Sequence, residues 1–173
     1  MLSLSDNEFS VLNFLVRNFT EKLTIRNIAQ RLNFSAAGVF NILKKLEQYN
    51  IVIGERLGTG LFYTINLENK IAEHLSAIVL LYSEEKTEKI NFEQLKQAKA
   101  AILDKKSLLL ITDNMTVLDI VIPNLDVTAK TEDEIVDLLR RKDSEILQFL
   151  KKGIVLFGED KVVDIIKKCI VRF

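Results

Sequence analysis

The side chains that most often carry catalysis or hold metals are scarce in this sequence. Cys169 is the only cysteine and His74 the only histidine among the 173 residues. A single cysteine excludes a disulfide within the chain and a zinc site built from several cysteines. The two residues also lie far apart in the sequence, so we interpret them as packing or surface residues. We therefore expect no metal, no cofactor and no nucleophile built from cysteine and histidine.

Lysine and arginine are the other side chains with a clear chemistry, because they neutralise phosphate groups. The chain has 24 basic and 24 acidic residues, so its formal net charge is zero. Up to Glu73 it has eight basic and seven acidic residues, which leaves a charge of +1. Any binding to nucleic acid must therefore depend on a local cluster of cations, not on the charge of the whole molecule.

Capping signals and apolar spacing predict three helices at the start of the chain. Ser5 and Glu8 have the spacing of a capping box, Thr24 can cap a second helix and Ser35 a third. The helices are expected over residues 5–18, 25–32 and 35–49. The side chains expected to face the core recur at three- and four-residue spacings and are Phe9, Leu12, Leu15, Val16, Phe19, Ile25, Ile28, Ala29, Leu32, Val39, Leu43 and Leu46.

A β-hairpin is predicted directly after the third helix. Asn50 is typical of the left-handed residue that ends a helix. Residues 51–56 and 61–65 have the pattern of two short strands, and residues 57–60 contain two glycines suited to the turn between them. Three helices followed by a two-stranded ribbon are the parts of a winged helix-turn-helix domain.

Residues 25–35 and the apolar and basic positions of residues 39–47 resemble the winged helix-turn-helix regulators of bacteria and archaea. The resemblance covers about residues 5–67. It implies that the third helix enters the major groove of double-stranded DNA with its first residues near the base edges. Base edges would be met by Ala36, Ala37, Phe40 and Asn41 and phosphates by Arg26, Lys44 and Lys45, and the wing would contribute Arg56 and Thr59. Ser35, which caps this helix, belongs to the same expected DNA-binding set.

The base-facing positions depart from the usual pattern of such regulators, which place polar or basic residues there. Only Asn41 can make a bidentate contact with adenine. Phe40 and the two alanines could touch thymine methyl groups, but they could equally face a protein. Two functions therefore remain open for this helix: DNA binding and protein docking.

The second half of the chain is predicted to be an α/β domain of three or four strands. A helix over residues 69–89 ends in the charged residues 84–86, where we place the domain boundary. The elements expected after it are a helix over residues 92–103, strands over residues 107–112, 116–122 and 125–129, helices over residues 132–141 and 144–152, a strand over residues 154–157 and a helix from Lys161.

Residues 118–122, 132–135 and above all 147–160 resemble the small nucleotidyltransferase domain that follows a winged helix in many archaeal proteins. Activity in that family needs a Gly-Ser pair after the first strand and an Asp-x-Asp that holds two magnesium ions. Here no glycine follows residues 107–112, and Val121 stands where the second aspartate would be. We expect an inactive domain in which Asp113, Asp119 and Asp126 are solvated turn or strand-end residues.

The predicted fold class is α+β: a winged helix of three helices and a β-hairpin wing, then a small nucleotidyltransferase-like α/β domain with flanking helices. The domains are expected to be residues 1–68, a linking helix at 69–89 that could form a dimer, and residues 90–173. No apolar run is long enough to span a bilayer and no secretory signal is visible, so we expect a cytoplasmic protein without a membrane partner.

The predicted function is transcription regulation by a homodimer that binds double-stranded DNA. Its second domain would not be an enzyme but would serve dimerisation, ligand binding or partner binding. One alternative is an interaction or assembly module whose winged helix meets a protein partner. A further alternative is a nucleotidyltransferase with an atypical site.

Overall fold

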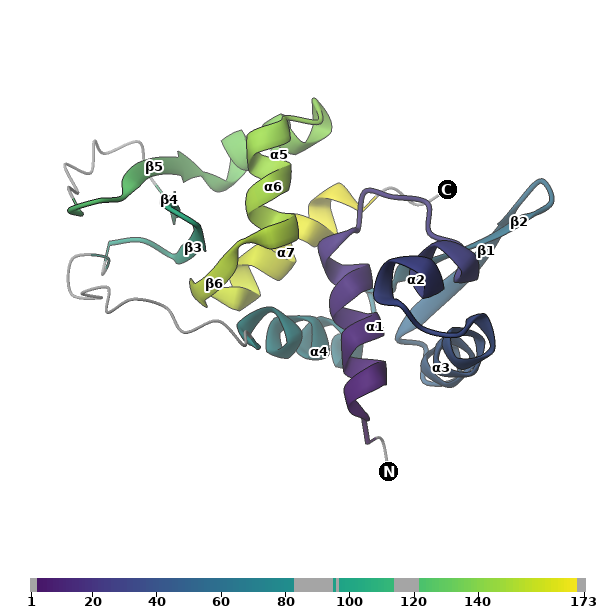
Figure 1. Cartoon of the computed structure of the whole chain (residues 1–173). Coiled ribbons are helices and arrows are strands. Elements are labelled where there is room, and N and C mark those ends of the chain that lie inside the picture. The colour runs from purple at the N-terminus through teal and green to yellow at the C-terminus, as the bar shows by residue number, and fades with distance from the viewer. Residues whose placement is uncertain (1–2, 83–94, 96, 114–121, 171–173) are drawn as a thin grey trace. The chain divides into compact units, whose positions relative to one another are not determined.

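The structure is a computed structural model that describes residues 3–82, 95, 97–113 and 122–170. Its fold is α+β, as predicted: three helices and a β-hairpin, then a small mixed sheet with flanking helices (Figure 1). The chain forms two compact units, which we call the N-terminal unit, ending at Val79, and the C-terminal unit, from Leu80 to Cys169. We describe each unit by itself.

The N-terminal unit has the predicted order of elements. Helices α1 (Asp6–Arg17), α2 (Ile25–Leu32) and α3 (Ala36–Gln48) are followed by the antiparallel strands β1 (Val52–Leu57) and β2 (Gly60–Ile65) and by helix α4 (Lys70–Leu81). The hairpin projects away from the three helices as a wing (Figure 1). An isolated bridge between Leu23 and Tyr63 joins the segment before α2 to the wing.

The three predicted helix caps are confirmed. Ser5 and Glu8 form a capping box, in which the Ser5 backbone N–H donates to Glu8 Oε2 at 2.8 Å. Thr24 caps α2, and the Ser35 hydroxyl accepts from the backbone N–H of Gly38 at 3.0 Å. Each such cap contributes about 1 kcal/mol to helix stability. The start of α3 is therefore fixed by its own sequence.

The inner face of α3 is completely buried, as its spacing predicts. Val39, Leu43 and Leu46 have no exposed surface, and Leu12 of α1 and Ile28 of α2 are equally buried. Burying one such side chain contributes about 2 kcal/mol. This core fixes which face of α3 remains in contact with solvent.

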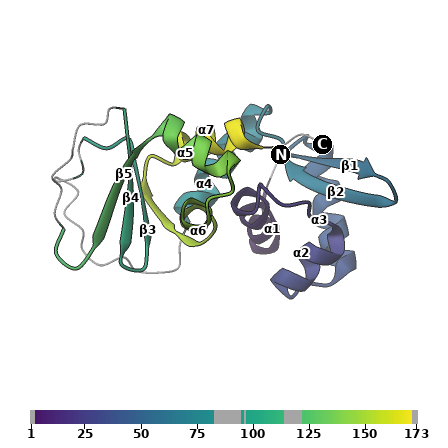
Figure 2. The ribbon, with the colours of Figure 1, turned by 90° about the horizontal axis from the view of Figure 1, so that it is seen from above.

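The C-terminal unit is a four-stranded sheet with helices on one face (Figure 2). The strand order is β5-β4-β3-β6, and only the β4–β5 pair is parallel. The elements are β3 (Ala100–Asp104), β4 (Ser107–Thr112), β5 (Asp126–Thr131), α5 (Glu132–Arg140), α6 (Ser144–Lys152), β6 (Ile154–Phe157) and α7 (Glu159–Cys169).

Both faces of this sheet are buried at its two central strands. Leu103 and Leu108 belong to a core cluster with Leu95, on the face away from the helices. Alternate residues of a strand point to opposite faces, so Ile102 and Leu109 lie on the face that the helices cover. All of these side chains are at most 9% exposed. This explains why the sequence of the strands is almost continuously apolar.

One predicted element disagrees with the structure in the residues that the structure describes. Residues 92–103 were expected to be helical, but Ala100–Asp104 is strand β3, which pairs with both β4 and β6. A short, fully apolar run has no period that separates a buried strand from a buried helix. As a result, Ser107–Thr112 is the second strand of a hairpin and not the first strand of its domain.

The remaining predicted elements agree with the structure to within a few residues. Strand β4 and helix α6 have the predicted bounds, α5 ends one residue early, and β5 and α7 begin at Asp126 and Glu159. The predicted strand at residues 116–122 lies almost entirely outside the described residues, as does the end of the helix predicted at 69–89. Within the described ranges, no helix is long and apolar enough to cross a membrane.

Candidate nucleic-acid interface

The face of α3 opposite the core is open to solvent. Its exposed positions follow one another at helical spacing, so they form a single surface and not scattered points. We call this surface the α3 face. Its members are Ala36, Ala37, Phe40, Asn41, Lys44, Glu47 and Gln48.

The first two turns of the α3 face contain no charged side chain. Phe40 is 45% exposed, and the neighbouring alanines and Asn41 are exposed as well. The first charge along the helix is that of Lys44. The four base-facing positions predicted from the sequence thus share one surface, and that surface offers methyl, aromatic and amide groups.

Three cations, on α2, α3 and β1, have no acidic partner in the part of the chain that the structure describes. Arg26 on α2, Lys44 on α3 and Arg56 on β1 are exposed and make no ion pair within the described ranges. By contrast, Arg31 is 2.5 Å from Glu21 Oε2, and Lys70 is 2.8 Å from Glu73 Oε1. The small net charge of this part of the chain therefore conceals an uneven distribution, in which α2, α3 and β1 each carry a cation that makes no ion pair within the described residues.

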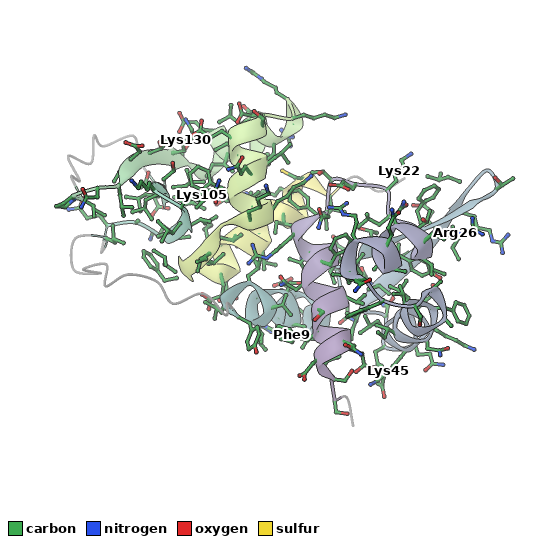
Figure 3. The ribbon with its side chains drawn as sticks, in the orientation of Figure 1. Phe9, Lys22, Arg26, Lys45, Lys105 and Lys130 are labelled. Atoms are coloured by element: carbon green, nitrogen blue, oxygen red, sulfur yellow. The ribbon has the colours of Figure 1, made fainter. Side chains whose placement is uncertain are left out.

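Lys45 differs from its neighbour Lys44. Its Nζ lies 2.7 Å from Glu8 Oε1 and donates to the carbonyl oxygen of Ser3 at 2.9 Å. Figure 3 shows Lys45 near the beginning of α1, away from Lys22 and Arg26. Burial would raise the pKa of the Glu8 carboxyl, but hydrogen bonds from Lys45 and Ser5 outweigh it and lower that pKa. Lys45 is thus used within the unit, and its predicted phosphate contact remains an untested prediction.

The base of the wing is tied to both helices of the helix-turn-helix. The Tyr63 backbone N–H donates to the Leu23 carbonyl oxygen at 2.8 Å, next to the start of α2. On the other side, the Gly54 backbone N–H donates to Glu47 Oε1 of α3 at 3.2 Å. Arg26, Lys44 and Arg56 are therefore carried by one connected scaffold.

The tip of the wing is a two-residue turn. Leu57 pairs with Gly60, so Gly58 and Thr59 form the turn, and both are exposed. Gly58 has a φ of +58°, which explains the glycine at the first central position. The structure places Thr59 at the very end of the hairpin, where a flanking groove could be reached.

Two exposed charged residues of the N-terminal unit, Lys22 and Glu47, are missing from the sequence-based set. Lys22 is exposed just before the bridge at Leu23, and Figure 3 shows it near Arg26. Glu47 brings a carboxylate to the α3 face, although the Gly54 N–H already binds it. Helical spacing from Phe40 could have identified Glu47. Lys22 could not be identified in this way, because its position depends on the bridge between Leu23 and Tyr63.

The aspartates considered for catalysis do not form a cluster in the described residues. Asp113 Oδ2 is 3.0 Å from Lys99 Nζ, and Asp126 is exposed at the start of β5. Asp119 lies outside the described residues. In the part of the chain that the structure describes, no three histidine, cysteine or acidic side chains are placed to hold a metal ion.

The main charged cluster of the C-terminal unit was not predicted. Glu132, the first residue of α5, accepts hydrogen bonds from Lys161 at 2.7 Å and from Lys168, both on α7. These bonds lower the pKa of the Glu132 carboxyl and raise the pKa of each lysine. The cluster borders a cavity of about 470 Å³ that Asp164 and Lys167 also line. Because the carboxylate is shared by two lysines, the cluster joins α5 to α7.

The fold and the exposed α3 face define a winged helix-turn-helix domain in the N-terminal unit. In agreement, residues 2–58 match the model of the MarR family. The match includes α1, α2, α3 and β1 but only about a third of the chain, and no part of the C-terminal unit. Comparisons with curated proteins and with solved structures gave no match. The resemblance of the C-terminal domain to nucleotidyltransferases has no support from these comparisons.

Proposed function

We propose that the protein is a DNA-binding transcriptional regulator that uses its winged helix to dock on double-stranded DNA. The observation that carries this proposal is the set of three exposed cations, Arg26 on α2, Lys44 on α3 and Arg56 on β1, which make no ion pair within the described residues. Helix-turn-helix proteins insert the corresponding helix into the major groove while neighbouring cations contact phosphates. The MarR match over residues 2–58 supports the same function.

The proposed active form is a homodimer. Three neutralised phosphates give only weak binding, and a second copy doubles the number of contacts. Helix α4 supports a dimer, because Ile71, Ile78 and Leu81 lie on one stripe of it and are 51%, 54% and 45% exposed. Sedimentation of Ile78→Glu would test this: a dimeric wild-type protein and a monomeric variant are expected, and a monomeric wild-type protein contradicts the dimer.

The C-terminal unit is proposed to be non-catalytic and to serve dimerisation or the binding of a ligand or partner. The sequence offers no Gly-Ser pair and no Asp-x-Asp. Of the aspartates considered for catalysis, Asp113 pairs with Lys99 and Asp126 is exposed. Its resemblance to a nucleotidyltransferase domain stays a prediction. So does a cytoplasmic location.

Fluorescence anisotropy of a labelled random-sequence duplex, measured at several salt concentrations, tests DNA binding. The logarithm of the binding constant should fall linearly with the logarithm of the salt concentration. A triple variant with Arg26→Gln, Lys44→Gln and Arg56→Gln should make this negative slope shallower by about 0.9 for each lost phosphate contact. The matched control is a triple variant of exposed cations in the C-terminal unit: Lys105→Gln, Lys106→Gln and Lys152→Gln.

The control has the same change in charge and should keep the wild-type slope. Equal slopes for the two triple variants would show that binding follows net charge and not the winged helix. Absence of binding to any duplex at low salt would contradict the proposal and would favour the alternative function, in which Phe40 and its neighbours dock on a protein.

A further inference from the structure

The first two turns of the α3 face lack every side chain that commonly reads G·C base pairs. Guanine is usually bound by arginine or lysine at O6 and N7, and cytosine N4 donates to a carboxylate. The exposed side chains here are those of Ala36, Ala37, Phe40 and Asn41. None of them carries a charge, although they occupy the part of the helix that lies closest to base edges in this type of domain.

The same side chains match the groups that an A·T pair presents in the major groove. Thymine offers its C5-methyl group, and adenine offers the N6 amino donor and the N7 acceptor. An amide can bind both adenine atoms, because Oδ1 accepts from N6–H while Nδ2 donates to N7. Phe40, whose ring is 45% exposed, directly precedes Asn41 in the sequence. It would therefore contact the base pair next to the adenine that Asn41 binds.

We infer that the start of α3 reads A·T base pairs, with Phe40 packed on thymine methyl groups and Asn41 bound to adenine. This inference rests on the proposed function and names the class of DNA sequence that the protein selects. Nucleic acid, and not a protein, is the occupant that the charges favour: Lys44, one turn further along α3, and Arg26 on α2 are exposed and make no ion pair within the described residues. The apolar contact supplies selectivity, and the cations supply affinity.

The test begins with selection of binding sites from a pool of random duplexes. The selected sites should be rich in A·T pairs at the positions that α3 faces. Single positions of the best site are then replaced by base analogues: uracil, which lacks the C5-methyl group, and 7-deaza-adenine, which lacks the N7 acceptor. Loss of one buried methyl group is expected to weaken binding about fourfold, and loss of the N7 contact should weaken it at least as much.

Two variants assign each effect to its side chain. Phe40→Ala should bind thymine and uracil duplexes equally but still respond to 7-deaza-adenine, whereas Asn41→Ala should show the reverse. Both residues are exposed, so the fold should tolerate these changes. Selected sites rich in G·C pairs, or a wild-type protein that does not distinguish thymine from uracil, would overturn the inference while leaving salt-dependent DNA binding intact. Failure to bind any duplex would instead contradict the proposed function itself.

Discussion

The cations that stand out in the two units are used in opposite ways. In the N-terminal unit, Arg26, Lys44 and Arg56 are spread over three elements and have no acidic partner in the described part of the chain. In the C-terminal unit, Lys161 and Lys168 converge on the single carboxylate of Glu132. Cations that have a partner hold a fold together, and exposed cations without one are available to a ligand.

The two units also differ in how tightly their turns are built. The wing tip of the N-terminal unit is open, since a Cβ added to Gly58 would have no atom within 4 Å. Gly158, between β6 and α7, is enclosed by the backbone of Lys99 and Ala100. An open tip leaves the wing free to contact a partner, whereas the enclosed glycine sets the packing of α7 on the sheet.

The largest expected effect comes from Gly158→Ala. Gly158 has a φ of +76°, and an added Cβ would lie 2.1 Å from the Lys99 carbonyl oxygen and 2.5 Å from the Ala100 Cα. An unfavourable φ alone costs about 1 to 2 kcal/mol. Displacement of β3 should raise the total loss to about 3 kcal/mol or more. Urea denaturation followed by circular dichroism measures this loss in the free energy of unfolding.

The matched control is Gly58→Ala, which has a similar φ of +58° but open space around it. It should cost only about 1 kcal/mol, because the backbone conformation is the sole penalty. If the two alanine variants were equally stable, the contrast between an enclosed turn and an open wing tip would be refuted.

A smaller effect is expected from removal of the carboxylate that each unit uses internally. Glu132→Gln should lower the free energy of unfolding by about 1 kcal/mol, since this ion cluster is partly exposed and screened by solvent. Glu8→Gln is the matched change in the N-terminal unit, where the carboxylate binds Lys45 and the Ser5 N–H. Both variants can be measured by urea denaturation at neutral pH.

The pH dependence of these variants follows from the direction of the shifts. Each glutamate has a folded-state pKa below its ordinary value of 4.5. The ionised carboxylate therefore contributes its full share to the free energy of unfolding above pH 4.5. This contribution disappears as the pH falls through the lower folded-state pKa. The difference in the free energy of unfolding between wild type and each variant should therefore become smaller as the pH falls. A difference that stays constant down to pH 3, roughly the lower end of carboxylate titration, would mean that neither carboxylate stabilises its unit as an anion.

Local signals made most of the fold predictable. The caps at Ser5, Thr24 and Ser35 and the spacing of Val39, Leu43 and Leu46 gave the helices and their inner faces correctly. Strand β3 was missed, because an apolar run buried on both faces has no period of its own. The exposure of Ala36, Ala37, Phe40 and Asn41 was predictable for the same reason as the core, since these residues lie on the opposite side of the helix.

Contacts between residues far apart in the sequence could not be predicted. The pairing of Lys45 with Glu8 and the sharing of Glu132 by Lys161 and Lys168 depend on how helices pack. Sequence reasoning therefore treated Lys44 and Lys45 as equivalent phosphate ligands. Nothing in the sequence around Lys168 indicates that this side chain closes the Glu132 cluster.

The smallest and most selective effect is expected from single changes at the adjacent lysines Lys44 and Lys45. Lys44 is exposed and unpaired within the described residues, so Lys44→Gln should reduce the salt dependence of DNA binding by about one phosphate contact, or 0.9 in slope. Lys45 is held by Glu8, so Lys45→Gln should keep the wild-type slope and instead lower the free energy of unfolding by about 1 kcal/mol or less. Anisotropy titrations and urea denaturation of the same two proteins separate these outcomes.

The same loss of salt dependence in both variants would mean that Lys45 leaves Glu8 when DNA binds. The distinction between cations that are paired and cations that are available to DNA would then fail within the N-terminal unit itself.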